Sequence, residues 1–206
     1  MTRIVIIGGG PAGYEAALVA AQHGGEVTLV DSDGIGGACV LWDCVPSKTF
    51  IASTGIRTEM RRASDLGISL DPSQAAVALP KIHDRVKSLA QAQSSDIAQR
   101  VTSVGVQLLA GRAEMIDSHV GMASHQIKAV LADGEERILD ADVVLIATGA
   151  RPRVVKGAEP DGERILNWRQ LYDLEALPEH LVVVGSGVTG AEFVSAYTEM
   201  GVKVTA

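Results

Sequence analysis

The sequence predicts an α/β fold in which helices cover a parallel sheet, with a second unit of the same kind beginning near residue 181. An apolar, strand-like run at residues 4–7 leads directly into a glycine-rich turn. An alanine-rich segment of helical character follows, and a second strand-like run at residues 27–30 ends on Asp31. A strand, a tight turn, a helix and a second strand in this order are typical of a βαβ unit.

The same arrangement occurs twice in the chain. A shift of 177 residues aligns Gly8 with Gly185, Gly10 with Gly187, Gly13 with Gly190 and Glu15 with Glu192. In each copy an apolar run precedes the glycines and a helix-like segment follows them, which is the context that makes a G-x-G-x-x-G pattern specific. Both copies therefore predict Rossmann-like dinucleotide-binding units.

The glycine spacing has a physical reason. The first glycine allows the tight turn, the second lets a pyrophosphate approach the backbone, and the third lets the helix pack closely on the strand. Asp31 stands where a carboxylate binds a ribose hydroxyl. The equivalent position in the second copy is 208, beyond Ala206. The choice between NAD and NADP therefore stays open, and we expect the chain to be a fragment.

Between the two motifs the pattern of apolar residues predicts helices and strands in alternation. The expected elements are helices over residues 39–62 and 73–104 and strands over residues 106–109, 126–131 and 143–147. Pro46 should make the start of the first of these helices irregular. The strand at 143–147 is a continuous apolar run, which predicts that it is buried.

The two motifs also predict the domain organisation. Residues 1–155 would form the N-terminal part of the first dinucleotide-binding domain, and residues 181–206 the truncated beginning of the second. The segment between them, residues 156–180, contains prolines and several charged residues, which favours a linker.

Composition narrows the class of protein. The 206 residues are 47% hydrophobic and 21% charged with a net charge of −7, so a nucleic acid or an anionic membrane is not an expected partner. No apolar run approaches the roughly 20 residues of a membrane-spanning helix. The N-terminus also lacks the pattern of a secretory leader, which predicts a cytoplasmic location. Two cysteines and five histidines do not predict a metal site.

The two cysteines, Cys39 and Cys44, are five residues apart. On a regular helix this spacing separates the Cα atoms by about 7.5 Å, more than the usual disulfide limit of about 6.8 Å. A bridge would need a distorted turn and would be easily reduced, which favours a catalytic couple over a structural disulfide. The alternative is a pair of reduced cysteines packed near a helix start.

The residues around this pair form a longer motif. Residues 36–48, GGACVLWDCVPSK, resemble the G-G-T-C-x-x-x-x-C-V/I-P-S-K signature of the flavoprotein disulfide reductases, the family of lipoamide dehydrogenase and glutathione reductase. The resemblance continues at residues 8–14, 111–113, 147–149 and 185–192, which are similar to the glycine, adenine-side, A-T-G and nicotinamide-nucleotide motifs of that family.

This resemblance implies an N-terminal FAD-binding domain, a second dinucleotide site for NAD or NADP, and a homodimer for the full-length protein. The implied FAD-binding residues are Gly8, Gly10, Pro11, Ala12, Gly13, Asp31, Gly37, Ala38, Cys39, Lys48, Ala113, Thr148 and Gly149. The implied nicotinamide-nucleotide residues are Gly185, Gly187, Gly190 and Glu192. Cys44 would be the thiol next to the flavin and Cys39 the thiol that exchanges with substrate. Lys48 and Glu192 would meet beside the flavin and also act in catalysis.

The resemblance implies an oxidoreductase that passes hydride from NAD(P)H through the flavin to the cysteine couple, and then to a small dithiol or disulfide substrate. The sequence departs from the family pattern at Leu41 and Asp43, where asparagine and glycine are usual, and Trp42 adds bulk. These departures keep open a quinone reductase of the same family that does not use the cysteines. A second alternative is a dinucleotide-binding module without catalytic activity.

Overall fold

The computed structural model describes residues 1–69, 71, 75–117 and 124–206 of the chain. These residues divide into two compact units. Unit 1 contains Met1–Leu41 and Gln91–Arg151, and unit 2 contains Trp42–Ala90 and Pro152–Ala206. The domain limits predicted at residues 155 and 180 were placed from the positions of the glycine motifs. The two units are instead defined by contacts in space. Those limits stay a prediction.

Unit 1 is built on a six-stranded sheet with the strand order β5-β4-β3-β2-β1-β6. The strands are β1 (Arg3–Ile7), β2 (Glu26–Asp31), β3 (Gln107–Asp117), β4 (His125–Leu131), β5 (Glu136–Ala141) and β6 (Val143–Ile146). The pairings β6-β1, β1-β2 and β2-β3 are parallel, whereas β4 and β5 form an antiparallel extension of β3. The predicted α/β fold with a mainly parallel sheet is confirmed.

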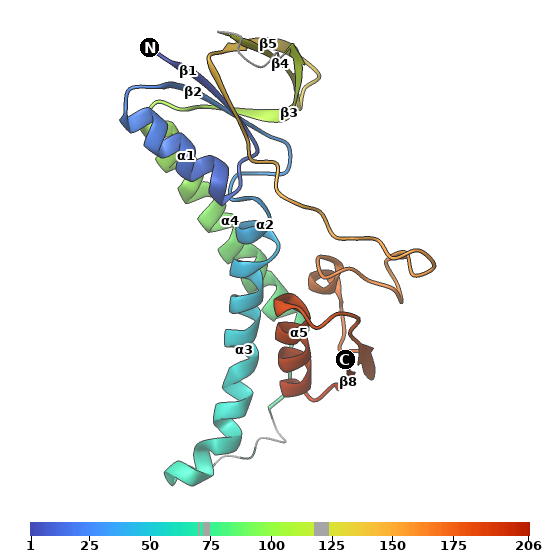
Figure 1. Ribbon diagram of the computed structural model, residues 1–206. Coiled ribbons are helices and arrows are strands. Elements are labelled where there is room, and N and C mark those ends of the chain that lie inside the picture. The colour runs from blue at the N-terminus through green and yellow to red at the C-terminus, as the bar shows by residue number, and fades with distance from the viewer. Residues whose placement is uncertain (70, 72–74, 118–123) are drawn as a thin grey trace. The chain divides into compact units, whose positions relative to one another are not determined.

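Helices cover one face of this sheet. α1 (Pro11–Gln22) follows β1 directly, and the last part of α4 (Leu79–Ser103) packs beside it, as Figure 1 shows. Ala17 and Val101 from these helices bury Ile6 and Leu29 of the sheet. The opposite face of β1 packs against β4 and β5, because the sheet curls and brings buried residues such as Ile127 over it.

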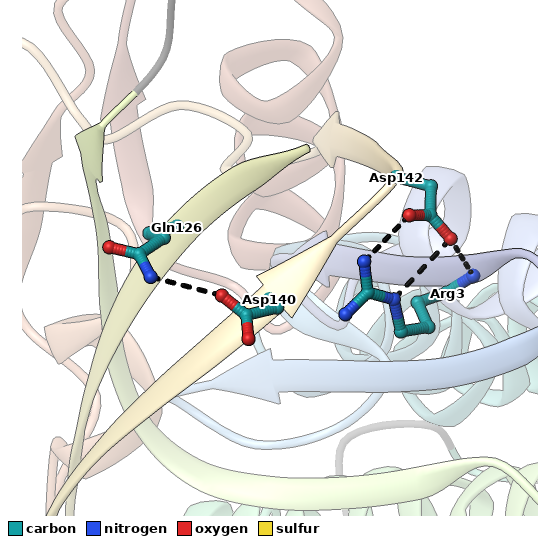
Figure 2. A network of polar contacts seen from close by, with 4 residues as sticks. All are labelled: Arg3, Gln126, Asp140 and Asp142. Carbon is teal, nitrogen blue, oxygen red and sulfur yellow. Dashed lines mark hydrogen bonds and ion pairs between the residues drawn. The ribbon is translucent and has the colours of Figure 1, made fainter. Parts of the chain in front are cut away.

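A polar contact joins the beginning of β1 to the connection between β5 and β6. Arg3 donates its backbone N–H to Asp142 Oδ2 over 2.8 Å and its guanidinium to Asp142 Oδ1 over 2.7 Å, as Figure 2 shows. The hydrogen bonds from Arg3 lower the pKa of Asp142 to about 2. In the neighbouring strand pair Gln126 donates to Asp140 over 3.1 Å. The Arg3–Asp142 contact helps to set the register in which β6 runs beside β1.

Unit 2 is mainly helical. Its elements are α3 (Cys44–Arg62), η1 (Ala63–Leu66), the first part of α4, η3 (Gln170–Asp173), β7 (His180–Val182), α5 (Val188–Glu199) and β8 (Lys203–Thr205). β7 and β8 are parallel and flank α5 in the sequence, so the predicted second βαβ unit is present. An aromatic cluster forms the core, with Phe50 touching the rings of Tyr172, Phe193 and Tyr197.

The structure corrects two details of the sequence prediction. The helix expected over residues 39–62 is two helices, because α2 (Gly37–Leu41) ends before Trp42 and α3 begins at Cys44. Pro46 lies in the first turn of α3, where a missing N–H is tolerated, and is not the point of irregularity. The strand expected to be buried at residues 143–147 is β6, the outer strand of the described sheet, and its Ile146 is 64% exposed.

Some predicted elements lie partly outside the described residues. The helix expected over residues 73–104 begins with residues 73 and 74, which lie outside the described residues. In the structure α4 begins at Leu79. The segment 156–180 supplies two core residues of unit 2, Leu171 and Tyr172. Among the helices in the described part of the chain, none combines the length and the apolar character needed to cross a bilayer.

Candidate functional site

The first glycine turn lies where β1 meets α1 in unit 1. Gly8 has a φ of +110°, and a Cβ there would lie 2.2 Å from the carbonyl oxygen of Ala147. A Cβ on Gly13 would lie 1.8 Å from the carbonyl oxygen of Gly8. These distances are far below any real Cβ contact, so both positions require glycine. The turn, the start of α1 and the end of β6 are therefore packed backbone to backbone.

Asp31 closes the same turn from the end of β2. Its Oδ2 accepts the N–H of Gly9 over 2.6 Å, and its Oδ1 accepts the N–H groups of Asp33 and Gly34 over 2.8 and 2.6 Å. The carboxylate thus orders the glycine turn and its own loop together. A carboxylate offers about four acceptor positions, so one remains for the ribose hydroxyl that the sequence predicts. The sequence did not indicate the backbone contacts of Asp31.

The loop after β2 brings a second set of glycines against this turn. Gly36 donates its N–H to the carbonyl of Gly9 over 2.8 Å, and a Cβ on Gly37 would lie 2.7 Å from the Cα of Gly10. At Gly10 and Gly37 the two loops meet through backbone alone, whereas the side chain of Ile35 lies against Gly9. A surface made of backbone alone is what a pyrophosphate needs in order to approach N–H groups. Ala38 and the half-buried Cys39 continue from it into α2.

The remaining predicted residues of unit 1 lie at the same edge of the sheet. Ala147 donates its N–H to the carbonyl of Ile7 over 2.8 Å, so Thr148 and Gly149 follow directly beyond the end of β1. Ala113 of β3 pairs with Ala129 of β4. It lies three residues after Ala110, which pairs with Asp31. Because the carboxyl ends of parallel strands meet at one edge, the structure brings these predicted residues together.

The second glycine turn in unit 2 repeats the first. Gly187, which precedes α5, has φ −69° and ψ 176°, whereas Gly10, which precedes α1, has φ −70° and ψ −178°. A Cβ on Gly190 would lie 2.1 Å from the carbonyl oxygen of Gly185, which has a φ of +122°. The internal repeat in the sequence is therefore also a repeat of backbone geometry.

A pocket of about 580 Å³ opens at this second turn, and we call it the second-motif pocket. Gly185, Gly187, Thr189 and Gly190 line one part of it. A second part comes from residues 152–168, including Arg153, Arg164 and Trp168, and apolar residues at 171, 181–184 and 193 complete the lining. The two arginines suit a phosphate-bearing ligand. Sequence reasoning missed these three residues, because it assigned Arg153 to the end of the first domain and Arg164 and Trp168 to a linker.

Lys48 of α3 and Glu192 of α5 form an ion pair within unit 2. The hydrogen bond from Lys48 to Glu192 raises the pKa of Lys48. Burial raises the pKa of Glu192, but hydrogen bonds from Lys48 and Ser47 and the charge of Lys48 outweigh it, so that the net pKa is lowered. Both groups are thus held in their charged forms. The predicted meeting of these two side chains is present, although it occurs within one compact unit.

Cys44 is exposed at the first position of α3. The preceding residue, Asp43, does not cap α3 but accepts a hydrogen bond from Thr189 Oγ1 over 3.4 Å. The buried hydroxyl of Tyr172 lies near the charges of Asp43 and Glu192. Its pKa is raised mainly by burial and further by these two negative charges. Cys39 belongs to unit 1 and Cys44 to unit 2. Their action as a redox pair stays a prediction.

Trp42 has a partner that the sequence did not indicate. The guanidinium carbon of Arg169 lies 5.1 Å from the centroid of the Trp42 ring and 5.7 Å from that of the Trp168 ring. Both distances are within the range of cation–π contacts. We call Trp42, Arg169 and Trp168 the tryptophan–arginine stack. It connects the residue two positions before Cys44 to the wall of the second-motif pocket.

These features are typical of redox proteins that use nucleotide cofactors. They are two glycine turns of one geometry, a Cys-x4-Cys segment and a lysine–glutamate pair. Comparison with protein families agrees: residues 2–206 match the pyridine nucleotide-disulphide oxidoreductase family, and the chain belongs to it. The resemblance inferred from the sequence motifs is thereby confirmed.

Individual relatives carry two kinds of name. The chain is 67% identical to an NAD(P)H dehydrogenase (quinone) of Mycobacterium tuberculosis, over all of this chain and 42% of that protein. It is 35% identical to a dihydrolipoyl dehydrogenase of Chlorobaculum parvum, over 98% of this chain and 41% of that protein. The chain thus spans less than half the length of these curated relatives.

Solved structures agree with the fold. The crystal structure of LpdA from Mycobacterium tuberculosis is similar with a TM-score of 0.92 and 65% identity, over 99% of this chain and 44% of that one. The flavoprotein disulfide reductase RclA from Escherichia coli has the same fold, with a TM-score of 0.77 at 22% identity, over 98% of this chain and 41% of that one.

Proposed function

We propose that this chain is part of an FAD-dependent oxidoreductase that transfers electrons from NAD(P)H to a Cys39/Cys44 disulfide and then to a small dithiol or disulfide substrate. The observation that carries the proposal is the Lys48–Glu192 ion pair. It joins the helix that begins at Cys44 to the helix that begins at the second glycine turn. The net reaction consumes one NAD(P)H and one proton and converts a disulfide into two thiols.

The residues of unit 1 fit FAD. The first glycine turn is a backbone surface that a Cβ at Gly13 or Gly37 would fill, and Asp31 stands beside it with acceptor capacity for a ribose. Gly8, Gly10, Pro11, Ala12, Thr148 and Gly149 would complete the binding surface. FAD supplies a carrier that accepts two electrons from a nicotinamide and gives them to a disulfide.

The residues of unit 2 fit a nicotinamide nucleotide. The second-motif pocket offers Arg153 and Arg164 to phosphates and the turn at Gly185 to a close backbone approach. Glu192 Oε2 is buried and has no hydrogen-bond partner among the described residues. This oxygen is available to accept a hydrogen bond from a nicotinamide carboxamide, and Lys48 holds a positive charge beside it that offsets developing negative charge.

A second function is favoured by a specific observation, the 67% identity to a protein named as a quinone-reducing dehydrogenase. The chain also has Leu41 and Asp43 where asparagine and glycine are usual between the two family cysteines, and Trp42 adds bulk. In this function electrons leave for a quinone without passing through the cysteines. The two functions share the nucleotide sites and differ in the role of Cys44.

Substituting Cys44 separates these functions. In the complete FAD-loaded protein, Cys44→Ser should abolish NAD(P)H-driven disulfide reduction, and reduced parent protein should show a thiolate–flavin charge-transfer absorption band that the variant lacks. Quinone reduction by the same preparations is the control activity. Disulfide reduction that survives in Cys44→Ser contradicts the dithiol function, and loss of quinone reduction as well contradicts the second function.

A module without catalytic activity is the remaining alternative. Anaerobic NADH or NADPH should bleach the yellow FAD-loaded protein, and absence of bleaching with both nucleotides would favour a binding module. We further propose a small-molecule substrate, a homodimer for the complete protein and a cytoplasmic location. Gel filtration of the complete protein with light scattering tests the dimer.

A further inference from the structure

The tryptophan–arginine stack holds the chain just before Cys44. Arg169 lies between the rings of Trp42 and Trp168, and its own backbone N–H donates to Asn167 Oδ1 over 3.0 Å. All three side chains of the stack are partly buried. A cation in contact with two aromatic rings is attracted to both, so the position that it favours depends on both rings.

A second contact reaches the next residue. Thr189 Oγ1 donates to Asp43 Oδ1 over 3.4 Å, so Asp43 is tied to the first turn of α5. Trp42 and Asp43 are the only residues between the end of α2 and Cys44. Both residues are therefore held by contacts from outside their own segment, immediately before Cys44.

The outer partners of these two contacts line the same pocket. Trp168 and Thr189 both belong to the wall of the second-motif pocket, whereas Arg169 lies behind that wall. A ligand that fills the pocket touches one end of each contact. The other ends are the two residues that precede Cys44.

We propose that the tryptophan–arginine stack and the Thr189–Asp43 hydrogen bond transmit the occupancy of the second-motif pocket to Cys44, with Arg169 as the positioning residue. This inference rests on the proposed function in one respect, that the ligand of the pocket is NAD or NADP. A bound nucleotide restricts Trp168 and Thr189, and through them Trp42 and Asp43. Cys44 then becomes less reactive toward an external electrophile, which couples the nucleotide site to the thiol.

The test measures alkylation of Cys44 rather than turnover. The complete FAD-loaded protein is reduced, freed of reductant without oxygen and treated with iodoacetamide, with and without saturating NADH or NADPH, neither of which can reoxidise the cysteines. Peptide mass spectrometry follows Cys44 alone. We expect the nucleotide to slow Cys44 alkylation by about fivefold or more in the parent and by less than about twofold in Arg169→Ala and Thr189→Val. Arg169→Lys and Thr189→Ser, which keep the cation and the hydroxyl, should retain part of the effect.

Arg164→Ala provides the matched control, because Arg164 lines the pocket but belongs to neither contact. This variant should need more nucleotide to reach saturation and then show the parental slowing. Nucleotide affinity is measured for every protein by calorimetry. If Arg169→Ala and Thr189→Val bind nucleotide and still show the full slowing, the nucleotide shields Cys44 directly and the proposal is overturned. Binding to the parent without any change in alkylation also overturns it. If neither nucleotide binds the parent, the proposed function fails and the coupling fails with it.

Discussion

Lys48 and Glu192 show how unequal surroundings shape one ion pair. The side chain of Lys48 is 59% exposed, whereas that of Glu192 is 16% exposed. The hydrogen bond to Glu192 raises the pKa of Lys48, so the lysine stays protonated throughout the neutral range. Exposed ion pairs contribute little to stability. In the proposed function the pair would instead fix a positive charge next to a buried carboxylate oxygen, which is a catalytic rather than a structural role.

Replacing Glu192 tests that interpretation. Glu192→Gln should slow flavin reduction by NADH by about tenfold. It should also move the alkaline limb of the pH–rate profile to lower pH, because Lys48 loses the main contact that raises its pKa. Rapid-mixing absorbance at several pH values measures both effects. Glu175→Gln, an exposed position, is the control. An unchanged alkaline limb in Glu192→Gln would show that Lys48 does not titrate in this step.

At the scale of elements, each glycine turn is held by contacts between backbone atoms. The third glycine of each motif lies against the carbonyl of the first, at Gly13 against Gly8 and at Gly190 against Gly185. Such contacts leave no room for a Cβ. At Gly55 within α3, by contrast, a Cβ would meet no described atom within 4 Å beyond the backbone of its own helix. Glycine is therefore required at the turns but not at this helical position.

This difference predicts opposite effects of the same substitution. Gly13→Ala should destabilise the protein by about 1 to 3 kcal/mol and weaken FAD retention, because the backbone must move. Gly55→Ala should stabilise it by about 0.5 to 1 kcal/mol, because alanine loses less backbone entropy in a helix. Urea unfolding and FAD fluorescence measure the two effects. Retention of FAD at the parental level in Gly13→Ala would contradict the backbone-contact interpretation of the turn.

The connection between β5 and β6 depends on a charge. The pKa of Asp142 is about 2, below the value of about 3.9 for an unfolded aspartate. A lowered folded-state pKa contributes stability above about pH 4, and that contribution is lost as the pH falls toward 2. Asp142→Asn should therefore lower the urea midpoint at pH 7, and the difference from the parent should shrink as the pH approaches 2.

A neighbouring carboxylate serves as the comparison for this pH dependence. Asp140 accepts one hydrogen bond from Gln126, and Asp140→Asn keeps an acceptor for it, so its midpoint should stay close to that of the parent at both pH values. A difference between parent and Asp142→Asn that is equally large near pH 2 and at pH 7 would mean that the Arg3–Asp142 ion pair is not its source.

At the scale of the whole molecule, the two units are stabilised by different kinds of core. The core of unit 1 consists of aliphatic residues between sheet and helices, such as Ile6, Leu29 and Val101. The core of unit 2 is an aromatic cluster whose members come from α3, α4, η3 and α5. Phe50 is at its centre, in contact with the rings of His83, Tyr172, Phe193 and Tyr197.

Phe50 should therefore be decisive for the stability of unit 2. Phe50→Ala should cost about 3 to 5 kcal/mol of the free energy of unfolding, because it removes a ring that is 1% exposed and leaves a cavity. Leu66→Ala, at a side chain that is 75% exposed, should change it by less than about 0.5 kcal/mol. Chemical denaturation measures both. A loss below about 1 kcal/mol in Phe50→Ala would indicate that the cluster repacks around the gap.

Much of the fold could be predicted because it is encoded in local patterns. The strand before each glycine motif, the helix after it and the strand at residues 126–131 each follow from residues within one short segment. The candidate site was predictable where it requires a residue type, as at Gly8, Gly13 and Gly190. The exposure of Ile146 on β6 was not predictable, because an apolar run does not reveal whether its strand has one neighbour or two.

The two glycine turns and the family could be read from the amino-acid sequence, because backbone geometry and short spacings are local properties. Which distant residues meet was settled only by tertiary packing. It placed Arg169 between Trp42 and Trp168, Thr189 beside Asp43 and Arg164 in the second-motif pocket. Arg169 and Thr189 are more than a hundred residues from Trp42 and Asp43, and no spacing rule links positions so far apart. Their contacts follow from the packing of α3, η3 and α5 around a common core.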